Sequence, residues 1–136
     1  MVDHLDPIAR SRNMSRIRSS NTKAERIVRQ AAHALGYRFR LYRHDLPGRP
    51  DLVFRSRRVV LFVNGCFWHR HQGCPRTTMP KIRSEYWSAK FKDNVERDAR
   101  KEQELKKLGW EVLIIWECET FDPTGLSRQL DVFLAE

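Results

Sequence analysis

Apolar residues recur along this chain with two periods, one typical of helices and one typical of strands. A period near 3.6 residues predicts helices, which span 22–35, 83–108 and 123–134. Alternating or continuous apolar runs predict strands, which span 37–42, 51–54, 58–63 and 110–116. The order α-β-β-β-α-β-α predicts an α/β fold with a mixed central sheet flanked by helices.

Local signals place the ends of these elements. Thr22 and Glu25 form a capping-box pattern that opens the first helix, and Gly36 is a typical C-terminal stop. Residues 55–57 are expected to join two strands as a hairpin. The long helix is expected to turn its large apolar residues inward, namely Trp87, Phe91, Val95, Leu105 and Leu108.

The 136 residues suit one hydrophobic core. We expect a polar, basic arm at 1–21 and a single domain at 22–136. With 40% apolar and 32% charged residues the chain is typical of a globular protein. It has no run near the roughly 18 apolar residues of a membrane span. Because the start carries acids and no apolar run, a cytoplasmic protein with no membrane partner is expected.

Positive charge is concentrated in one part of the chain. The net charge is +9, and residues 10–58 alone hold fourteen Lys or Arg against three acidic residues. Thirteen of those fourteen are Arg, whose planar guanidinium binds phosphate in a bidentate manner. A polyanionic partner is therefore predicted, and nucleic acid is favoured over a merely solvated surface.

The chain has three cysteines, and an odd number argues against a disulfide framework. Cys66, His71 and Cys74 fall within nine residues, and Cys118 follows the last predicted strand. Three thiolates and one imidazole make a closed tetrahedral set that suits a structural Zn²⁺. By spacing alone His69 could replace His71, and three unrelated free thiols are the alternative.

Asp51 opens a predicted strand whose neighbour ends at Phe62-Val63-Asn64. Many Mg²⁺ nucleases place an aspartate there, followed by an acid-x-Lys triplet on the next strand, because Mg²⁺ takes hard oxygen ligands beside substrate phosphate. Here the triplet position has neither acid nor lysine. On this pattern alone, Pro50-Asp51 is more simply a turn.

Several separated motifs together carry a more specific signal. They are RSRNMSRI at 10–17, LPGRPD at 46–51, GCFWH at 65–69, NVERD at 94–98 and LGWEVLIIWEC at 108–118. On these motifs the sequence resembles the very-short-patch repair endonucleases, over roughly residues 8–120. The resemblance implies a restriction-endonuclease-like mixed sheet with a structural zinc site. The activity it implies is nicking of duplex DNA 5′ to the thymine of a T·G mismatch.

The resemblance also assigns roles to single residues. Asp51 and the backbone carbonyl of Val63 would ligate one or two Mg²⁺ ions. His69 would act as the general base or orient the attacking water, as suits an imidazole. Glu25 and Asp98 would hold water bound to the metal. The single structural zinc would take Cys66, His71, Cys74 and Cys118. A monomer is expected.

DNA contacts follow from the same resemblance and from charge. Phe67, Trp68 and Trp87 would wedge between base steps from one side, and Met14 from the other. For Phe67 and Trp87 the alternative is a packing role in the core. The expected phosphate contacts are Arg10, Arg12, Arg16, Arg18 and Lys23, with Lys90 and Arg97 as weaker candidates.

Asn64 stands where the family carries a histidine. Asn64 cannot accept a proton near neutral pH, although its amide can hydrogen-bond water or phosphate. We therefore expect a functional but slower site, with Asn64 among the catalytic residues. Two alternatives stay open: a less selective or structure-specific nickase, and a DNA-binding module that has lost catalysis.

Overall fold

The computed structural model describes residues 22–135. Its elements are α2 (Lys23–Ala34), β1 (Arg40–Leu41), β2 (Leu52–Phe54), the 3₁₀ turn η1 (Arg55–Arg57), β3 (Val59–Asn64), α3 (Ser84–Lys107), β4 (Glu111–Trp116), the 3₁₀ turn η2 (Glu117–Phe121) and α4 (Pro123–Leu134). The predicted order of elements is thereby confirmed.

The four strands form one mixed sheet in the order β1-β2-β3-β4. β1 pairs with β2 and β2 with β3 in antiparallel fashion, whereas β3 and β4 are parallel and pair from Val59↔Glu111 to Asn64↔Trp116. The two parallel strands are joined by α3, which is the connection that a parallel pair requires. The predicted mixed α/β architecture is confirmed.

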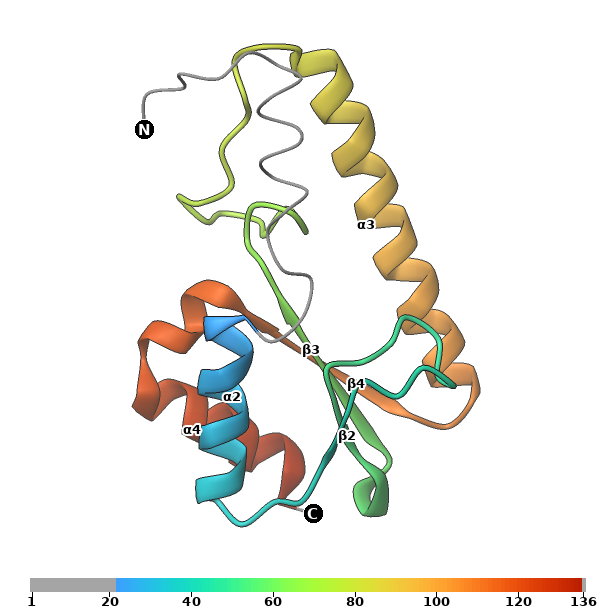
Figure 1. The fold of residues 1–136 in the computed structure, drawn as a ribbon, viewed down its shortest axis with the longest axis vertical. Coiled ribbons are helices and arrows are strands. Elements are labelled where there is room, and N and C mark those ends of the chain that lie inside the picture. Colours follow the sequence, from blue (N-terminus) through green and yellow to red (C-terminus); the bar gives the residue numbers. More distant parts are fainter. Residues whose placement is uncertain (1–21, 136) are drawn as a thin grey trace.

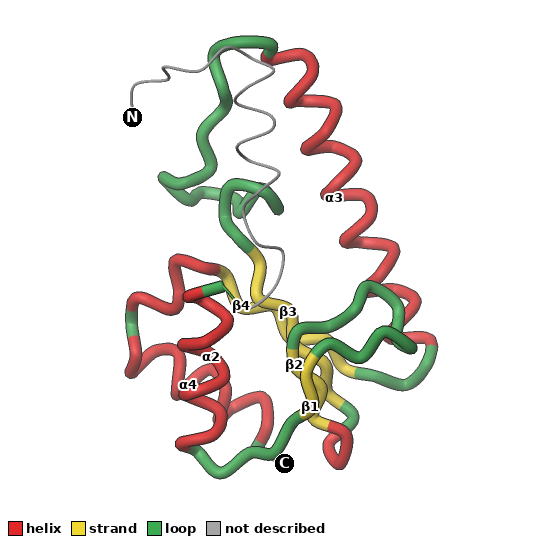
Figure 2. Tube along the Cα trace, in the orientation of Figure 1, coloured by secondary structure: helices red, strands yellow, loops and turns green. Residues whose placement is uncertain are grey.

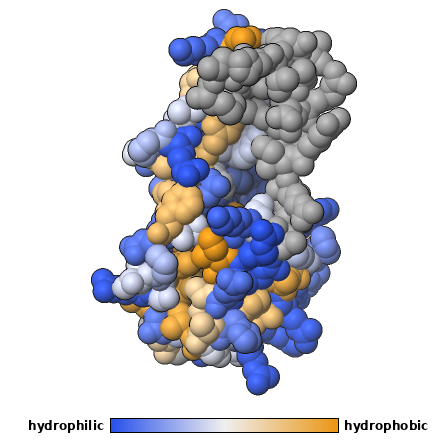
Figure 3. Space-filling view, turned by 60° about the vertical axis from the view of Figure 1, so that its left-hand side comes forward, coloured by the Kyte–Doolittle hydropathy of each residue, from blue (hydrophilic) through white to orange (hydrophobic). Residues whose placement is uncertain are grey.

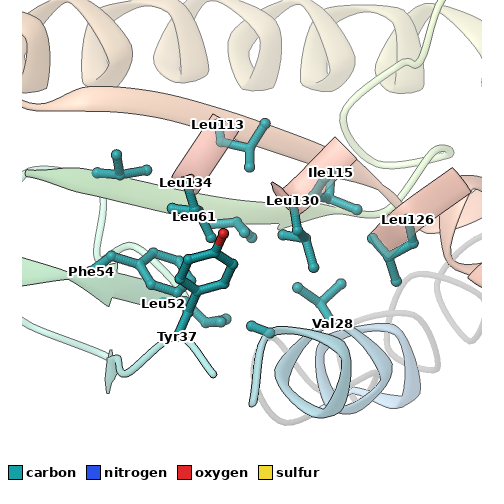
Figure 4. Packing of buried hydrophobic residues seen from close by; sticks show 12 residues of the cluster. Val28, Tyr37, Leu52, Phe54, Leu61, Leu113, Ile115, Leu126, Leu130 and Leu134 are labelled. Atoms are coloured by element: carbon teal, nitrogen blue, oxygen red, sulfur yellow. The ribbon is translucent and has the colours of Figure 1, made fainter. Parts of the chain in front are cut away.

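One face of the sheet is covered by α2 and α4, which lie side by side (Figures 1 and 2). Alternate strand residues, among them Leu52, Leu61 and Ile115, point to this face and are fully buried. They meet Val28 of α2 and Leu130 of α4 in the main core (Figure 4). Period-2 alternation in the strands and the 3.6 period in the helices thus converge on one apolar layer.

The opposite face carries the intervening residues Val53 and Val60, which pack against Leu105 of α3 and Trp110. Only the C-terminal part of α3 contacts the sheet, and its N-terminal part extends beyond the sheet (Figure 1). Because α3 extends past the sheet, it connects the core to the loop that follows β3.

Two residues of α3 were predicted inward and are exposed instead. Val95 is 45% and Leu108 54% exposed, whereas Trp87, Phe91 and Leu105 are buried as predicted. The helical period identifies an apolar face but not whether another layer covers it. Val95 lies on the part of α3 that has left the sheet, and Leu108 is the helix C-cap.

The predicted strand at 37–42 is reduced to the two residues of β1. Tyr37 is held in the core by a 2.6 Å hydrogen bond from its hydroxyl to Asp131, and Tyr42 has a left-handed φ of 52°. Tyr42 therefore leaves the extended conformation, and the strand ends at Leu41. The helix signals hold: Thr22 Oγ1 accepts from Glu25 N–H, and Gly36 has φ +89° after α2.

No helix within 22–135 is long and apolar enough to span a bilayer.

Candidate active site

Asp51 stands at the end of the sheet where β2 begins and β3 ends. Its backbone N–H donates to the Leu61 carbonyl at 3.0 Å, and its carboxylate Oδ2 accepts from the Val63 N–H at 2.7 Å. This carboxylate therefore ties together the two strand ends that the sequence predicted to converge. Oδ1 has no hydrogen bond from another residue of the described chain.

Burial, and to a lesser extent the nearby negative charge of Glu25, raises the pKa of the Asp51 carboxyl from 3.8 to about 7. The Val63 N–H, His69 and Arg29 act in the opposite direction without cancelling the burial. A carboxyl whose ionised form is disfavoured by burial and by a second carboxylate is stabilised when a positive charge binds beside it. Such a place is suited to a divalent cation.

Glu25 reaches this region from the first turn of α2. It is 3% exposed, and its Oε2 accepts a 2.8 Å hydrogen bond from the Tyr42 hydroxyl. The N-cap bond at its backbone explains the helix start, but it does not explain a buried carboxylate near Asp51. Glu25 thus has a place in the site beyond the capping role.

His69 and Asp98 form a pair, with Nδ1 2.5 Å from Asp98 Oδ2. An ionised carboxylate only accepts hydrogen bonds, so Nδ1 carries the proton and donates it, which leaves Nε2 as the acceptor nitrogen. One turn earlier on α3, Asn94 donates to the Trp68 carbonyl at 3.3 Å. The helix therefore holds His69 in one orientation from two sides.

Asp51, His69 and Asp98 line one cleft of about 510 Å³ between the sheet end and α3. Its polar and charged lining comprises Tyr42, His44, Arg49, Asp51, Asn64, His69, Asp98, Lys101 and Glu102. Asn64, the last residue of β3, is only 7% exposed, and no hydrogen bond from its amide joins it to another described residue. A buried amide at the cleft wall is available to a ligand.

The second cluster lies in the loop after β3. The donor atoms of Cys66, His71, Cys74 and Cys118 all fall within 4.8 Å of one another. This Cys₃His set has the composition and convergence of a structural zinc site. Burial raises the pKa of the Cys66 thiol, so a thiolate there requires a neutralising cation.

The structure brings His71, rather than His69, to the three cysteines. His71 Nδ1 lies 3.5 Å from Cys118 Sγ, and its ring stacks on Trp116 at 4.3 Å between centroids. His69 faces the cleft and Asp98 instead. Since Trp116 ends β4 and Cys118 follows it, the cluster connects the loop to a core strand, as predicted.

An aromatic cluster joins this loop to α3. Phe67 lies edge-on to Trp68 and Phe91, each at 5.2 Å between centroids, and Trp68 lies 6.2 Å from Trp87. Phe67 and Trp68 are partly exposed, whereas Trp87 is 2% exposed and packs against Trp68. The packing alternative thus describes Trp87 in this structure, and its contact with DNA stays a prediction.

Two cations border the aromatic cluster. Lys90 Nζ lies 5.5 Å and 5.4 Å above the rings of Trp68 and Trp87, and Arg70 lies 4.0 Å above Phe91. Met79, Ile82 and Tyr86 are exposed just before and at the start of α3. Figure 3 shows a small apolar patch at the end of the molecule where α3 begins. Aromatic rings and cationic side chains therefore occur together where the loop after β3 meets α3.

The remaining predicted DNA contacts are not tested by the fold. Arg10, Arg12, Met14, Arg16 and Arg18 lie outside the described residues. Lys23 and Arg97 are exposed on the first turn of α2 and on α3.

Sequence reasoning missed several lining residues of the cleft. Tyr42 and His44 precede the LPGRPD motif without any regular spacing, so nothing marked them. Arg49 lies inside that motif, and Lys101 lies one turn beyond Asp98 on α3. The helical spacing from Asp98 could have marked Lys101.

Comparison with known proteins decides the family. Residues 2–76 match the family described as DNA mismatch endonuclease Vsr, a segment that includes Asp51 and three of the four cluster donors. The chain belongs to the Vsr family. It is 52% identical over 130 residues to the type II nicking enzyme V.XorIIP of Xanthomonas oryzae pv. oryzae, covering 96% of this chain and 95% of that protein.

Other Vsr-family relatives span the chain as well. Identity to the DNA mismatch endonuclease Vsr of Escherichia coli K12 is 43% over 139 residues, covering 98% of this chain and 88% of that protein. Identity to the type II nicking enzyme V.NmeAIP of Neisseria meningitidis is 38% over 136 residues, covering 100% and 96%. The family thus includes relatives that are named as mismatch endonucleases and relatives that are named as nicking enzymes.

Proposed function

We propose that this protein is an endonuclease that nicks one strand of duplex DNA at a T·G mismatch, 5′ to the thymine. The observation that carries the proposal is the single cleft that holds the Asp51 carboxylate, the Asn64 amide and the His69–Asp98 pair. Family membership supports the same reaction class, since the related chains are named as endonucleases and nicking enzymes.

The residues present fit a catalytic Mg²⁺. Asp51 Oδ1 and the Val63 carbonyl would hold it, with Glu25 adding negative charge behind Asp51. All of these are hard oxygen donors or carboxylates, the ligands that Mg²⁺ prefers. When bound, the ion supplies positive charge against the phosphate and a more acidic water.

The protein's own groups supply the proton chemistry and the orientation. His69 presents Nε2 to the cleft as a proton acceptor for the attacking water, because Asp98 fixes the proton on Nδ1. Asn64 has no proton to exchange near neutral pH, so its part is to orient water or a phosphate oxygen. Hydrolysis forms a bond from the water oxygen to phosphorus and breaks the phosphorus–oxygen bond to the leaving strand end. His69 takes the proton of the attacking water, and the leaving oxygen takes a proton from solvent water.

Recognition of the mismatch is assigned to the partly exposed aromatic rings of Phe67 and Trp68. A mismatched step unstacks more readily than a paired one, so a rigid apolar wedge favours it. The aromatic cluster is attached to α3 through the contact of Phe67 with Phe91, and Phe67 directly follows Cys66 of the Cys₃His set.

A less selective nickase on the same scaffold is the second candidate. It is favoured by Asn64 in place of the family histidine and by the relatives named simply as nicking enzymes. The two candidates differ only in how the rate depends on the mismatch, so one substrate panel separates them.

The deciding experiment uses matched and T·G duplexes with a different label on each strand, incubated with full-length protein and Mg²⁺. We expect one nick in the thymine strand, 5′ to the mismatched base, and loss of nicking in Asp51→Asn. Asp93→Asn, which removes an exposed carboxylate of α3 outside the cleft, serves as the matched control and should retain wild-type activity.

Three other outcomes would each correct the proposal. Equal nicking of matched and mismatched duplexes would establish the less selective enzyme. Binding without cleavage in Mg²⁺ or Mn²⁺ would indicate a DNA-binding module that has lost catalysis. Equal rates for wild type and Asp51→Asn would show that the site is elsewhere.

A further inference from the structure

The strand beside Asp51 lacks the lysine that many Mg²⁺ nucleases carry there, since β3 ends in Phe62-Val63-Asn64. A cation nevertheless lines the same cleft, because Lys101 reaches it from α3. Lys101 follows Asp98 by three residues, so both belong to the face of α3 that borders the cleft. Lys101 of α3 therefore supplies to the cleft the positive charge that β3 does not supply.

Gly48 fixes the stem of Lys101. A Cβ atom at Gly48 would lie 2.7 Å from Cδ and 3.0 Å from Cγ of Lys101, closer than any real side chain allows. The aliphatic part of Lys101 therefore lies directly on the Gly48 backbone, which also lines the cleft. A stem held in this way loses little further freedom when its ammonium binds an anion.

The two acidic residues of α3 that line the cleft with Lys101 have other partners. Asp98 binds His69, and the Glu102 carboxylate lies 3.7 Å from the Lys106 ammonium. Within residues 22–135 no salt bridge joins Lys101 to an acid, and the same holds for Arg49 on the nearby loop. A partly buried ammonium without a counter-ion attracts an anionic ligand.

We infer that Lys101 binds a phosphate group of the strand to be cut and stabilises negative charge that develops on it during hydrolysis. The inference rests on the proposed function, and it adds a catalytic contact that no motif in the sequence assigns. Arg49, the residue after Gly48, lines the same cleft and adds a second positive charge.

The test compares Lys101→Met, which keeps the length of the stem and removes the charge, with Lys101→Arg and with the control Lys107→Met. Lys107 is exposed on the last turn of the same helix and does not line the cleft. Single-turnover nicking is measured with saturating protein, and duplex affinity is measured without divalent ion as a function of salt.

For Lys101→Met we expect a nicking rate roughly 100- to 1000-fold lower, the scale of losing one contact to developing negative charge in the transition state. The slope of log affinity against log salt should fall by about 0.9, the value for one phosphate contact. Lys101→Arg should recover most of both quantities, and Lys107→Met should match wild type. Wild-type values for Lys101→Met in both measurements would overturn the inference.

The two arms separate this inference from the proposed function. If wild type fails to nick any duplex, the proposed function fails, and the salt slope still decides whether Lys101 contacts phosphate. If wild type nicks and Lys101→Met is unchanged in rate and slope, the function stands and the role of Lys101 is wrong. Circular dichroism and zinc content confirm that each variant is folded.

Discussion

Asp51 Oδ2 accepts a hydrogen bond from the Val63 N–H at 2.7 Å, so a single carboxylate joins the start of β2 to the end of β3. Burial of this carboxyl, together with the nearby charge of Glu25, raises its pKa to about 7. The ionised Asp51 carboxylate therefore lowers the stability of the fold when no cation is bound beside it. Such costs are common at functional sites.

The first prediction concerns stability against pH. An unfolded aspartate has a pKa near 3.8, so between about pH 4 and pH 7 the folded protein retains a proton at Asp51 that the unfolded chain loses. The stability contributed by that proton is complete below pH 4 and is lost as pH rises through 7. Asp51→Asn does not ionise, so it should be the more stable protein at pH 8, by roughly 2–4 kcal/mol.

Urea unfolding of wild type and Asp51→Asn from pH 4 to pH 8, without divalent ion, checks this. The gap should widen up to about pH 7 and then level off. Adding Mg²⁺ at pH 8 should stabilise wild type and leave Asp51→Asn unchanged, because only the carboxylate gains a counter-charge. Parallel stability curves for the two proteins would contradict the prediction.

Zinc binding should distinguish the two histidines of the loop. His71→Ala removes a donor that lies 3.5 Å from Cys118 Sγ, and it should lose the ion and much of the fold's stability, because metal binding contributes folding free energy. Cys118→Ser should behave alike. His69→Ala, whose ring faces Asp98, should keep one zinc per chain and melt close to wild type.

Zinc content by mass spectrometry and melting by calorimetry provide the two readings. Retention of zinc by His71→Ala, or its loss from His69→Ala, would reverse the assignment of the two rings.

These histidines also show what the sequence could and could not predict. The positions of Cys66, Cys74 and Cys118 predicted the metal set, because three thiolates with one imidazole make a complete tetrahedral set for zinc. They could not separate His69 from His71, since a loop without regular period does not indicate where a ring points. In the structure His71 stacks on Trp116 and lies beside Cys118, whereas His69 pairs with Asp98.

Periodicity had the same strength and the same limit in α3. It located the helix within a residue at each end and identified Trp87, Phe91 and Leu105 as buried. It was wrong for Val95, because a one-dimensional period does not report where the sheet ends. The contact between Lys101 and Gly48 joins residues far apart in the chain, so no local pattern could predict it.

Arg70 should be needed for the rigidity of the aromatic cluster. Its Nη1 donates to the carbonyls of Phe67 at 3.2 Å and Thr78 at 2.9 Å, and its guanidinium lies 4.0 Å above Phe91. Arg70→Met should lower the free energy of unfolding by roughly 1–3 kcal/mol, the range for charged hydrogen bonds. Arg70→Lys should recover only part, since one ammonium lacks the planar fork.

Urea unfolding checks the stability, with Arg128→Met, an exposed arginine of α4, as the control. If the wedge reads the mismatch, Arg70→Met should also reduce the ratio of T·G to matched nicking. Unfolding free energies equal to the control would show that the contacts of Arg70 contribute nothing net.

The last prediction separates the roles of His69 and Asp98. Asp98 accepts the Nδ1 proton and so presents Nε2 as the base. In Asp98→Asn the amide can donate to Nδ1, which favours the opposite tautomer and places the proton on Nε2. Single-turnover nicking should fall about 100-fold or more in Asp98→Asn and in His69→Ala, the scale of general-base catalysis.

The double variant should be no slower than His69→Ala alone, because Asp98 acts only through His69. Multiplied losses in the double variant would mean that Asp98 acts on the substrate or its metal independently, as a holder of water rather than as the group that orients the base.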